Sequence, residues 1–329
     1  MRIGYGAAVA PQEYIAVQKS DYTVFPIKMH LILDLLQVFS KESSHNSINK
    51  IDYMHSYLAS LHNTQLIHNQ KKIIVIYRLL IAPTIALFSL VFFQHTASAA
   101  TLTVAVAANL QYALEEIKTE FKKETGQDLQ LSYGSSGKFV TQIINGAPFD
   151  VFLSADMAYP DYLYQQSYAT AAPKIYAYGS LVLWSIKKQD LAQWQSLLIG
   201  NSVSKIALAN PKTAPYGREA MNALSYYKLE TRLKPKLVFG DSISQTNQYI
   251  HSGLADIGFT AKSVVLSREM KDQGSWIEIP PESYQPIAQG AIILKHGKEN
   301  NPIPAQQFYD FLSSAKARAI FQKSGYTLP

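Results

Sequence analysis

The feature that most constrains this chain is a junction between a strand and a helix at residues 131–138. An apolar, β-prone segment (residues 129–133) runs into Gly134-Ser135-Ser136-Gly137-Lys138, and a helical pattern of apolar residues follows at once. The glycines permit a tight turn, and a serine occupies the expected position of a helix N-cap. N–H groups at a helix start lack intrahelical partners, and the helix dipole adds partial positive charge. The junction therefore suits an anion.

This junction is not a Walker phosphate loop. In that pattern the first glycine would fall on Ser132 and the closing Ser/Thr on Phe139. A Gly/Ser turn before a helix is in most proteins only a turn, but here the same arrangement recurs. A predicted strand is followed by a predicted helix in this way at three further places: Ala108-Asn109, Pro215-Tyr216 and Ser242-Ile243. Helix starts that converge between two lobes would bind a dianion through neutral donors.

Strands and helices alternate from residue 101 onward, which predicts an α/β fold. The expected strands lie at residues 101–107, 129–133, 149–153, 205–209, 237–239, 256–260 and 288–294. The expected helices lie at residues 110–125, 136–145, 218–227, 243–252, 305–312 and 315–323, with one more after each of residues 156 and 260. This alternation implies parallel sheets covered by helices on both faces, with ligands at the carboxyl ends of the strands.

The strands fall into two sets, which predicts two lobes. A long apolar run at residues 175–186 indicates a crossover near residue 180, and the chain returns near residue 285. We expect lobe 1 to comprise residues 100–180 plus 286–329, and lobe 2 to comprise residues 181–285. The ligand cleft is expected between them.

The segment 71–99 has the pattern of a secretory signal. Lys71-Lys72 precede an apolar core at residues 79–93, and Ala97-Ser98-Ala99 follows. A transmembrane anchor is the alternative, but only about 15 uninterrupted apolar residues are present, whereas a span needs roughly 20. We expect export to the periplasm with cleavage after Ala99.

Residues 1–70 fit no part of this organisation. No sustained helical or strand period emerges there. A signal peptide belongs at the start of a chain, yet these residues precede the signal at 71–99. We therefore expect that translation begins downstream of Met1 and that residues 1–70 are not made.

Composition removes several classes of function. The chain has no cysteine, which excludes disulfides, thiolate metal sites, cysteine nucleophiles and a lipoprotein anchor. The net charge of +6 is mild and not clustered, so nucleic acid is not indicated as a partner. Six of the eight histidines lie before residue 100, so only His251 and His296 remain for a metal site or a catalytic triad. We predict no catalytic residue, no direct metal ligand and no cofactor.

Three other functions on the same fold agree less well with the sequence than an anion receptor does. An enzyme acting on a carboxylate substrate would have to use Lys138 or Asp241, and the sequence supplies no convergent acid and base. The sensing half of a regulator would be preceded by a DNA-binding helix-turn-helix, which is absent from the sequence before the lobes. A sugar site would need aromatic platforms, and only Tyr216 qualifies. Sulfate and phosphate remain as alternative ligands.

Structural roles compete with binding roles for several residues. Asn109 and Ser136 are types that also cap helices. Tyr216 is also suited to packing the cleft wall. The other polar residues near the junctions are expected at the surface, in caps or at strand ends: Lys138, Asp150, Asp156, His251 and His296.

The segment from residue 100 to 329 resembles the periplasmic molybdate-binding proteins of ABC transporters. The resemblance rests on motifs at residues 104–110, 133–138, 146–156, 210–217 and 308–326. The most specific is Gly146-Ala147-Pro148-Phe149-Asp150-Val151-Phe152-Leu153-Ser154-Ala155-Asp156. The resemblance implies a two-lobed, type II-like periplasmic-binding-protein fold. Such a protein holds molybdate, and also tungstate, in the cleft and delivers it to a membrane permease. A monomer is expected.

The resemblance also implies which residues hold the oxyanion. They are the Ala108 amide, Asn109, Ser136, the Tyr216 amide and the Ile243 amide. Two departures matter: many relatives carry serine at the position of Asn109, and some donate a tyrosine hydroxyl from the segment around Thr260. No tyrosine occurs between Ile257 and Ser263. The preference between molybdate and tungstate therefore stays open.

Overall fold

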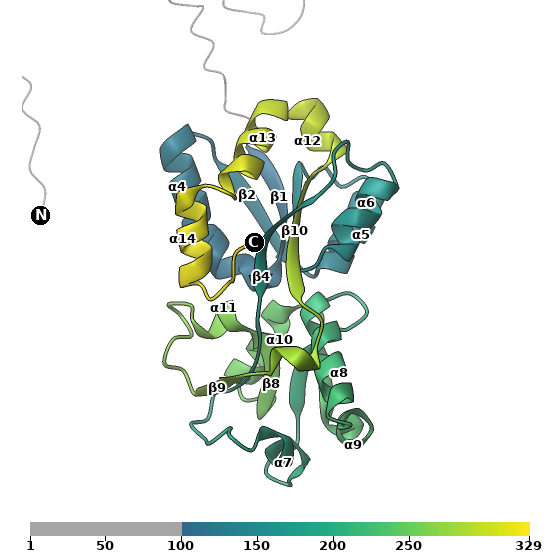
Figure 1. The fold of residues 1–329 in the computed structure, drawn as a ribbon, viewed down its shortest axis with the longest axis vertical. Coiled ribbons are helices and arrows are strands. Elements are labelled where there is room, and N and C mark those ends of the chain that lie inside the picture. The colour runs from purple at the N-terminus through teal and green to yellow at the C-terminus, as the bar shows by residue number, and fades with distance from the viewer. Residues whose placement is uncertain (1–100) are drawn as a thin grey trace, which may run out of the picture. The chain divides into compact units, whose positions relative to one another are not determined.

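The computed structural model describes residues 101–329, which form two lobes connected by two crossings of the chain (Figure 1). The expected extension at residues 1–70 and the expected signal at residues 71–99 lie outside the described residues. Within the described range, no helix combines the length and the apolar character needed to cross a membrane.

Lobe 1 is built on a five-stranded sheet in the order β2-β1-β3-β10-β4. Its strands are β1 (Leu102–Ala107), β2 (Leu129–Gly134), β3 (Val151–Ser154), β4 (Lys174–Gly179) and β10 (Ile287–Ile293). β1 pairs in parallel with β2 and β3, whereas β10 is antiparallel to β3 and β4. The expectation of a purely parallel sheet is wrong here, because β10 enters from lobe 2 and runs away from the cleft.

Lobe 2 has a second five-stranded sheet in the order β7-β6-β8-β5-β9. Its strands are β5 (Leu181–Ser185), β6 (Ile206–Ala209), β7 (Leu237–Gly240), β8 (Ile257–Ala261) and β9 (Ser275–Glu278). β6 is parallel to β7 and β8, whereas β5 is antiparallel to β8 and β9. The parallel expectation fails for the same reason, since β5 enters this lobe from the cleft.

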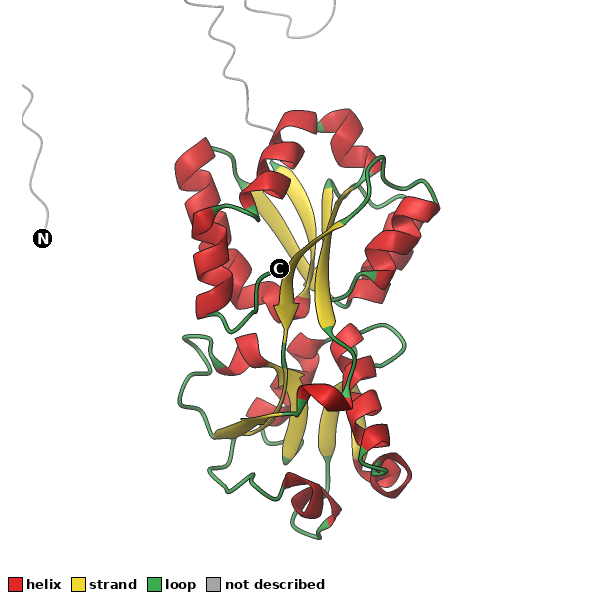
Figure 2. Ribbon diagram, viewed as in Figure 1, coloured by secondary structure: helices red, strands yellow, loops and turns green. Residues whose placement is uncertain are grey.

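Helices cover both faces of the lobe 1 sheet (Figure 2). One face carries α4 (Gln111–Thr125), α13 (Pro302–Phe311) and α14 (Ala315–Lys323), and the other carries α5 (Ser136–Ile144) and α6 (Ala158–Gln165). The apolar stripe predicted for residues 110–125 is confirmed, since Leu114, Ile117 and Phe121 are fully buried. The rings of Phe121 and Phe308 meet edge to face at 5.3 Å. α12 (Lys295–Asn300) lies between β10 and α13 in the sequence.

Lobe 2 packs a mixture of long and short helices on its sheet. These are α7 (Trp194–Ile199), α8 (Pro215–Tyr226), α9 (Glu230–Leu233), α10 (Ile243–His251) and α11 (Lys262–Val265). The sequence indicates α8 and α10 but not α7 and α9, which are too short to show a clear helical period. Its largest core cluster joins side chains from α7, α8 and β8, including Trp194, Ala220 and Phe259.

The apolar run at residues 175–186 becomes two strands of different sheets. β4 ends at Gly179 and β5 begins at Leu181, so the chain crosses between the lobes at Ser180. It returns between β9 and β10, beside the first crossing in Figure 1. β1, β2, β3, β6 and β7 all run toward the cleft, which brings their carboxyl ends to one place.

Candidate functional site

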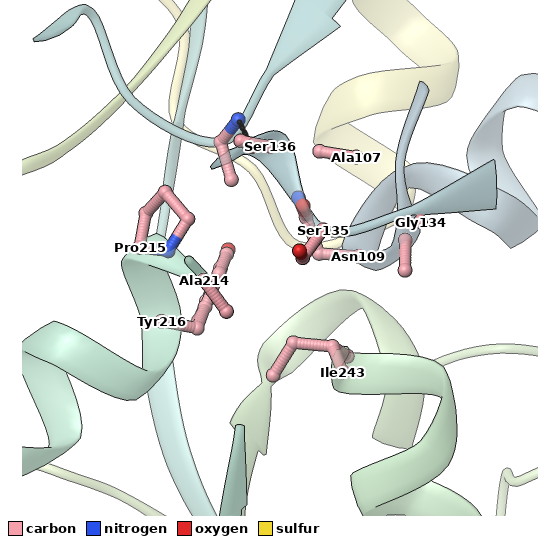
Figure 3. A pocket seen from close by; sticks show the side chains of 11 residues that line it. Ala107, Asn109, Gly134, Ser135, Ser136, Ala214, Pro215, Tyr216 and Ile243 are labelled. Carbon is pink, nitrogen blue, oxygen red and sulfur yellow. Dashed lines mark hydrogen bonds between the residues drawn. The ribbon is translucent and has the colours of Figure 1, made fainter. Parts of the chain in front are cut away.

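The junctions singled out in the sequence meet in one pocket between the lobes (Figure 3). The pocket is small: the free space between its walls, its open mouth included, amounts to about 200 Å³. Its lining residues are Ala107, Ala108, Asn109, Gly134, Ser135, Ser136, Ala155, Ala214, Pro215, Tyr216 and Ile243. The five residues expected to hold an oxyanion all belong to this set, and none of the lining residues carries a charge.

Three helices begin at the pocket. Ser136 is the first residue of α5, Tyr216 is the second residue of α8 after Pro215, and Ile243 is the first residue of α10. N–H groups in the first turn of a helix have no acceptor within that helix. Three helix starts, each at the positive end of a helix dipole, therefore meet around one small space. Two of their first-turn N–H groups are already paired, Gly137 with the Thr213 carbonyl and Gln245 with Ser242 Oγ.

Ser136 offers its hydroxyl to the pocket. The side chain is buried, and its Oγ accepts a hydrogen bond from the Ala155 N–H at 3.0 Å. A hydroxyl that accepts one bond still has its own O–H to donate. The contact with Ala155 fixes Oγ at the end of β3.

Asn109 uses its carboxamide within the protein. Its Nδ2 donates to Gln289 Oε1 at 2.9 Å and to the Tyr326 hydroxyl at 2.9 Å. Its carbonyl accepts from Ser263 Oγ of lobe 2 at 2.8 Å. With both N–H groups of the carboxamide occupied, the donor that Asn109 has left is its main-chain amide. The carboxamide, which was a candidate donor to the ligand, therefore holds the short 3-10 helix Ala108–Leu110 in position instead.

Burial keeps the tyrosines of this region neutral. Desolvation raises the pKa of Tyr326 to about 12 and that of Tyr216 well above its ordinary value. The Tyr216 hydroxyl has no hydrogen-bond partner and occupies the place that a Cβ on Gly179 would need. Its side chain therefore packs under the crossing between the lobes.

Polar contacts between the lobes flank the pocket. Arg218 of α8 donates to Asp156 Oδ2 at 2.9 Å, and Lys138 of α5 lies 2.7 Å from Asp241 Oδ2. Lys138 was expected to be simply solvated; it is half exposed, but it forms an ion pair across the cleft. The Gly137 N–H donates to the Thr213 carbonyl at 2.8 Å.

Asp150 and His296 form a separate pair away from the pocket. The Asp150 carboxylate is buried and accepts from the Thr103 N–H at 2.7 Å, as expected of a residue at a strand end. His296 Nδ1 lies 2.8 Å from Asp150 Oδ1. His296 thus keeps 38% of its side chain exposed, as expected of a surface residue, and in addition forms a structural contact.

A family model of bacterial extracellular solute-binding proteins matches residues 102–327. The chain belongs to that family.

This solute-binding protein has relatives of known name. The molybdate-binding protein ModA of Azotobacter vinelandii is 40% identical over 233 residues, covering 70% of this chain and 92% of that protein. ModA of Rhodobacter capsulatus is 38% identical over 231 residues, covering 70% of this chain and 89% of that protein.

Solved structures agree with the sequence relatives. The periplasmic molybdate-binding protein of Azotobacter vinelandii superimposes with a TM-score of 0.66 at 37% identity, covering 69% of this chain and 99% of that one. The sulfate-binding protein SubI of Mycobacterium tuberculosis shares the fold with a TM-score of 0.57 at 13% identity. These structural matches show that this solute-binding protein has the two-lobed α/β fold of periplasmic binding proteins.

Sequence reasoning missed three residues at or behind the pocket: Ser135, Gln289 and Tyr326. Gln289 is fully buried inside the apolar strand β10, and such an isolated polar residue is a signal that it has a specific partner. Ser135 belongs to the predicted junction beside Ser136, but only Ser136 was expected to bind the ligand. Nothing in the local sequence indicates that Tyr326 reaches Asn109, because the two are 217 positions apart.

Proposed function

We propose that this solute-binding protein captures molybdate, and also tungstate, in the pocket between its lobes. It would then present the ion to the permease of an ABC transporter from the periplasm, acting as a receptor and not as an enzyme. The observation that carries the proposal is the convergence of three helix starts on a small uncharged pocket. The similarity to molybdate-binding proteins supports the identity of the ligand.

The donor set fits a fully deprotonated tetrahedral dianion. Such an ion offers acceptors in four directions, and the pocket offers N–H and O–H donors from both lobes. The proposed donors are the amides of Ala108 and Asn109, the Ser136 hydroxyl, and the amides of Tyr216 and Ile243. Because these donors are neutral and fixed by helices and strand ends, they select by position and size more than by charge.

Molybdate and tungstate are nearly the same size and are larger than sulfate and phosphate. A pocket whose donors are set for the larger ions leaves gaps around the smaller ones, which then lose hydrogen bonds. This argument makes no distinction between molybdate and tungstate, so we propose that both bind.

We also propose that the two lobes close on the ion about the crossings near residues 180 and 285. Lobe 1, with three of the proposed donors, would receive the ion first, and lobe 2 would add the Tyr216 and Ile243 amides on closure. The contacts of Arg218, Lys138 and Gly137 across the cleft would stabilise the closed form.

Calorimetric titration of the purified protein with molybdate, tungstate, sulfate and phosphate tests the proposal. We expect tight binding of the first two and none of the last two. Ser136→Ala should weaken molybdate binding about 10-fold to 100-fold, because a hydrogen bond to a charged group is lost. Binding of sulfate or phosphate, or of none of the four ions, would contradict the assignment.

A further inference from the structure

Ser135 is a buried serine whose hydroxyl has no partner. Its side chain lines the pocket, the residue is only 4% exposed, and Oγ forms no hydrogen bond within the protein. Leaving a buried hydroxyl unpaired costs about 1–3 kcal/mol. A feature with that cost at a ligand site calls for a specific reason.

Helix capping does not provide that reason. Ser135 occupies the N-cap position of α5, but its side chain accepts no bond from the first turn. Two other serines of the described chain occupy the same position and do cap: Ser242 accepts from the Gln245 N–H, and Ser314 accepts from the Ala317 N–H. Ser135 alone among these three has its hydroxyl in the pocket.

The neighbouring side chains leave a place for another donor. The Asn109 carboxamide is occupied by Gln289 and Tyr326, and Ser136 Oγ is engaged by the Ala155 N–H. Ser135 and Ser136 lie on one side of the pocket, and Tyr216 and Ile243 lie on the other (Figure 3). An ion held between these two sides would come within reach of the Ser135 hydroxyl.

We propose that the Ser135 hydroxyl donates a hydrogen bond directly to the bound oxyanion. This inference rests on the proposed function and adds a second side-chain donor to it. Lobe 1 then holds the ion with two adjacent hydroxyls, one fixed by Ala155 and one free to rotate toward an oxygen of the ligand. The unpaired hydroxyl is satisfied when the ligand is present.

Ser135→Ala tests the inference, with Ser314→Ala as a matched control. Ser314 is also an N-cap serine of lobe 1, but its hydroxyl caps α14 and it does not line the pocket. Both variants and the unmodified protein are titrated with molybdate and melted without ligand. We expect Ser135→Ala to bind about 10-fold to 100-fold more weakly at an equal or higher melting temperature, because an unpaired buried hydroxyl is removed. Ser314→Ala should melt lower and bind as the unmodified protein does.

Each other outcome has a definite meaning. A Ser135→Ala variant that binds molybdate as tightly as the unmodified protein overturns the role of Ser135 and leaves the proposed function intact. A variant that melts lower and binds normally shows a capping role and also overturns it. If the unmodified protein binds no molybdate, the proposed function itself fails, and the inference fails with it. Ser135→Gly, a residue tolerated at N-caps, provides a second variant should Ser135→Ala fold poorly.

Discussion

The two lobes contribute to the pocket in different ways. Lobe 1 brings hydroxyl groups, those of Ser135 and Ser136, beside the main chain of the segment after β1. Lobe 2 brings only main-chain donors at the starts of α8 and α10, together with the apolar surfaces of Ala214, Pro215 and Ile243. Side-chain truncation should therefore weaken binding directly in lobe 1. In lobe 2 only a change that moves a helix start, or one that breaks a contact between the lobes, should do so.

The largest effect is expected from Gly217→Ala in lobe 2. A Cβ at Gly217 would overlap the carbonyl of Ala209 at the end of β6, so the first turn of α8 must move. We expect a loss of about 3 kcal/mol in the free energy of unfolding, together with loss of the Tyr216 donor. Thermal melting and molybdate titration measure the two effects, and an unchanged melting temperature would show that α8 accommodates the methyl group.

A smaller effect, confined to binding, is expected from Gly137→Ala in lobe 1. A Cβ at Gly137 would lie 3.0 Å from the Thr213 Cα of the opposite lobe. It would also lie 2.6 Å from the Tyr159 hydroxyl of its own lobe, at the end of a side chain that can shift. We expect about 10-fold weaker molybdate binding at an equal or higher melting temperature, because alanine favours the helix. Unchanged affinity would mean that the lobes need not approach this closely.

The two ion pairs across the cleft should contribute unequally to molybdate affinity. Asp156 is nearly buried and faces Arg218, whereas Lys138 and Asp241 are both well exposed. Exposed pairs contribute little, but removing the partner of a buried charge costs more. We expect Arg218→Met to weaken molybdate binding about fivefold and Lys138→Met to weaken it less than about twofold. Titration at low and high salt measures both, and a larger loss in Lys138→Met would reverse this ranking.

The smallest effect on binding is expected from Ser242→Ala, the lobe 2 counterpart of Ser135→Ala. Ser242 caps α10 by accepting from the Gln245 N–H, so its loss should cost about 1 kcal/mol of stability. Affinity for molybdate should stay within about twofold, because the Ile243 amide is part of the main chain. A strong loss of affinity without a change in stability would place the Ser242 hydroxyl on the ligand instead.

Much of this architecture follows from local sequence, and the rest depends on distant contacts. The apolar stripe of α4 and the turn before α5 can be predicted from the sequence, because helical periodicity and turn-forming residues are patterns of a few neighbouring positions. The antiparallel placement of β5 and β10 is not visible, since it follows from the chain crossing between lobes. The orientation of the Asn109 carboxamide depends on Gln289, 180 positions away, and no local pattern encodes it.

A crystal structure of the purified protein with tungstate tests the central claim most directly, because tungsten scatters strongly enough to be located without ambiguity. We predict one ion in the pocket, with its oxygens within hydrogen-bonding distance of the Ser135 and Ser136 hydroxyls on one side. On the other side they should meet the Tyr216 and Ile243 amides. An ion held by lysine or arginine side chains, or located outside this pocket, would contradict the claim.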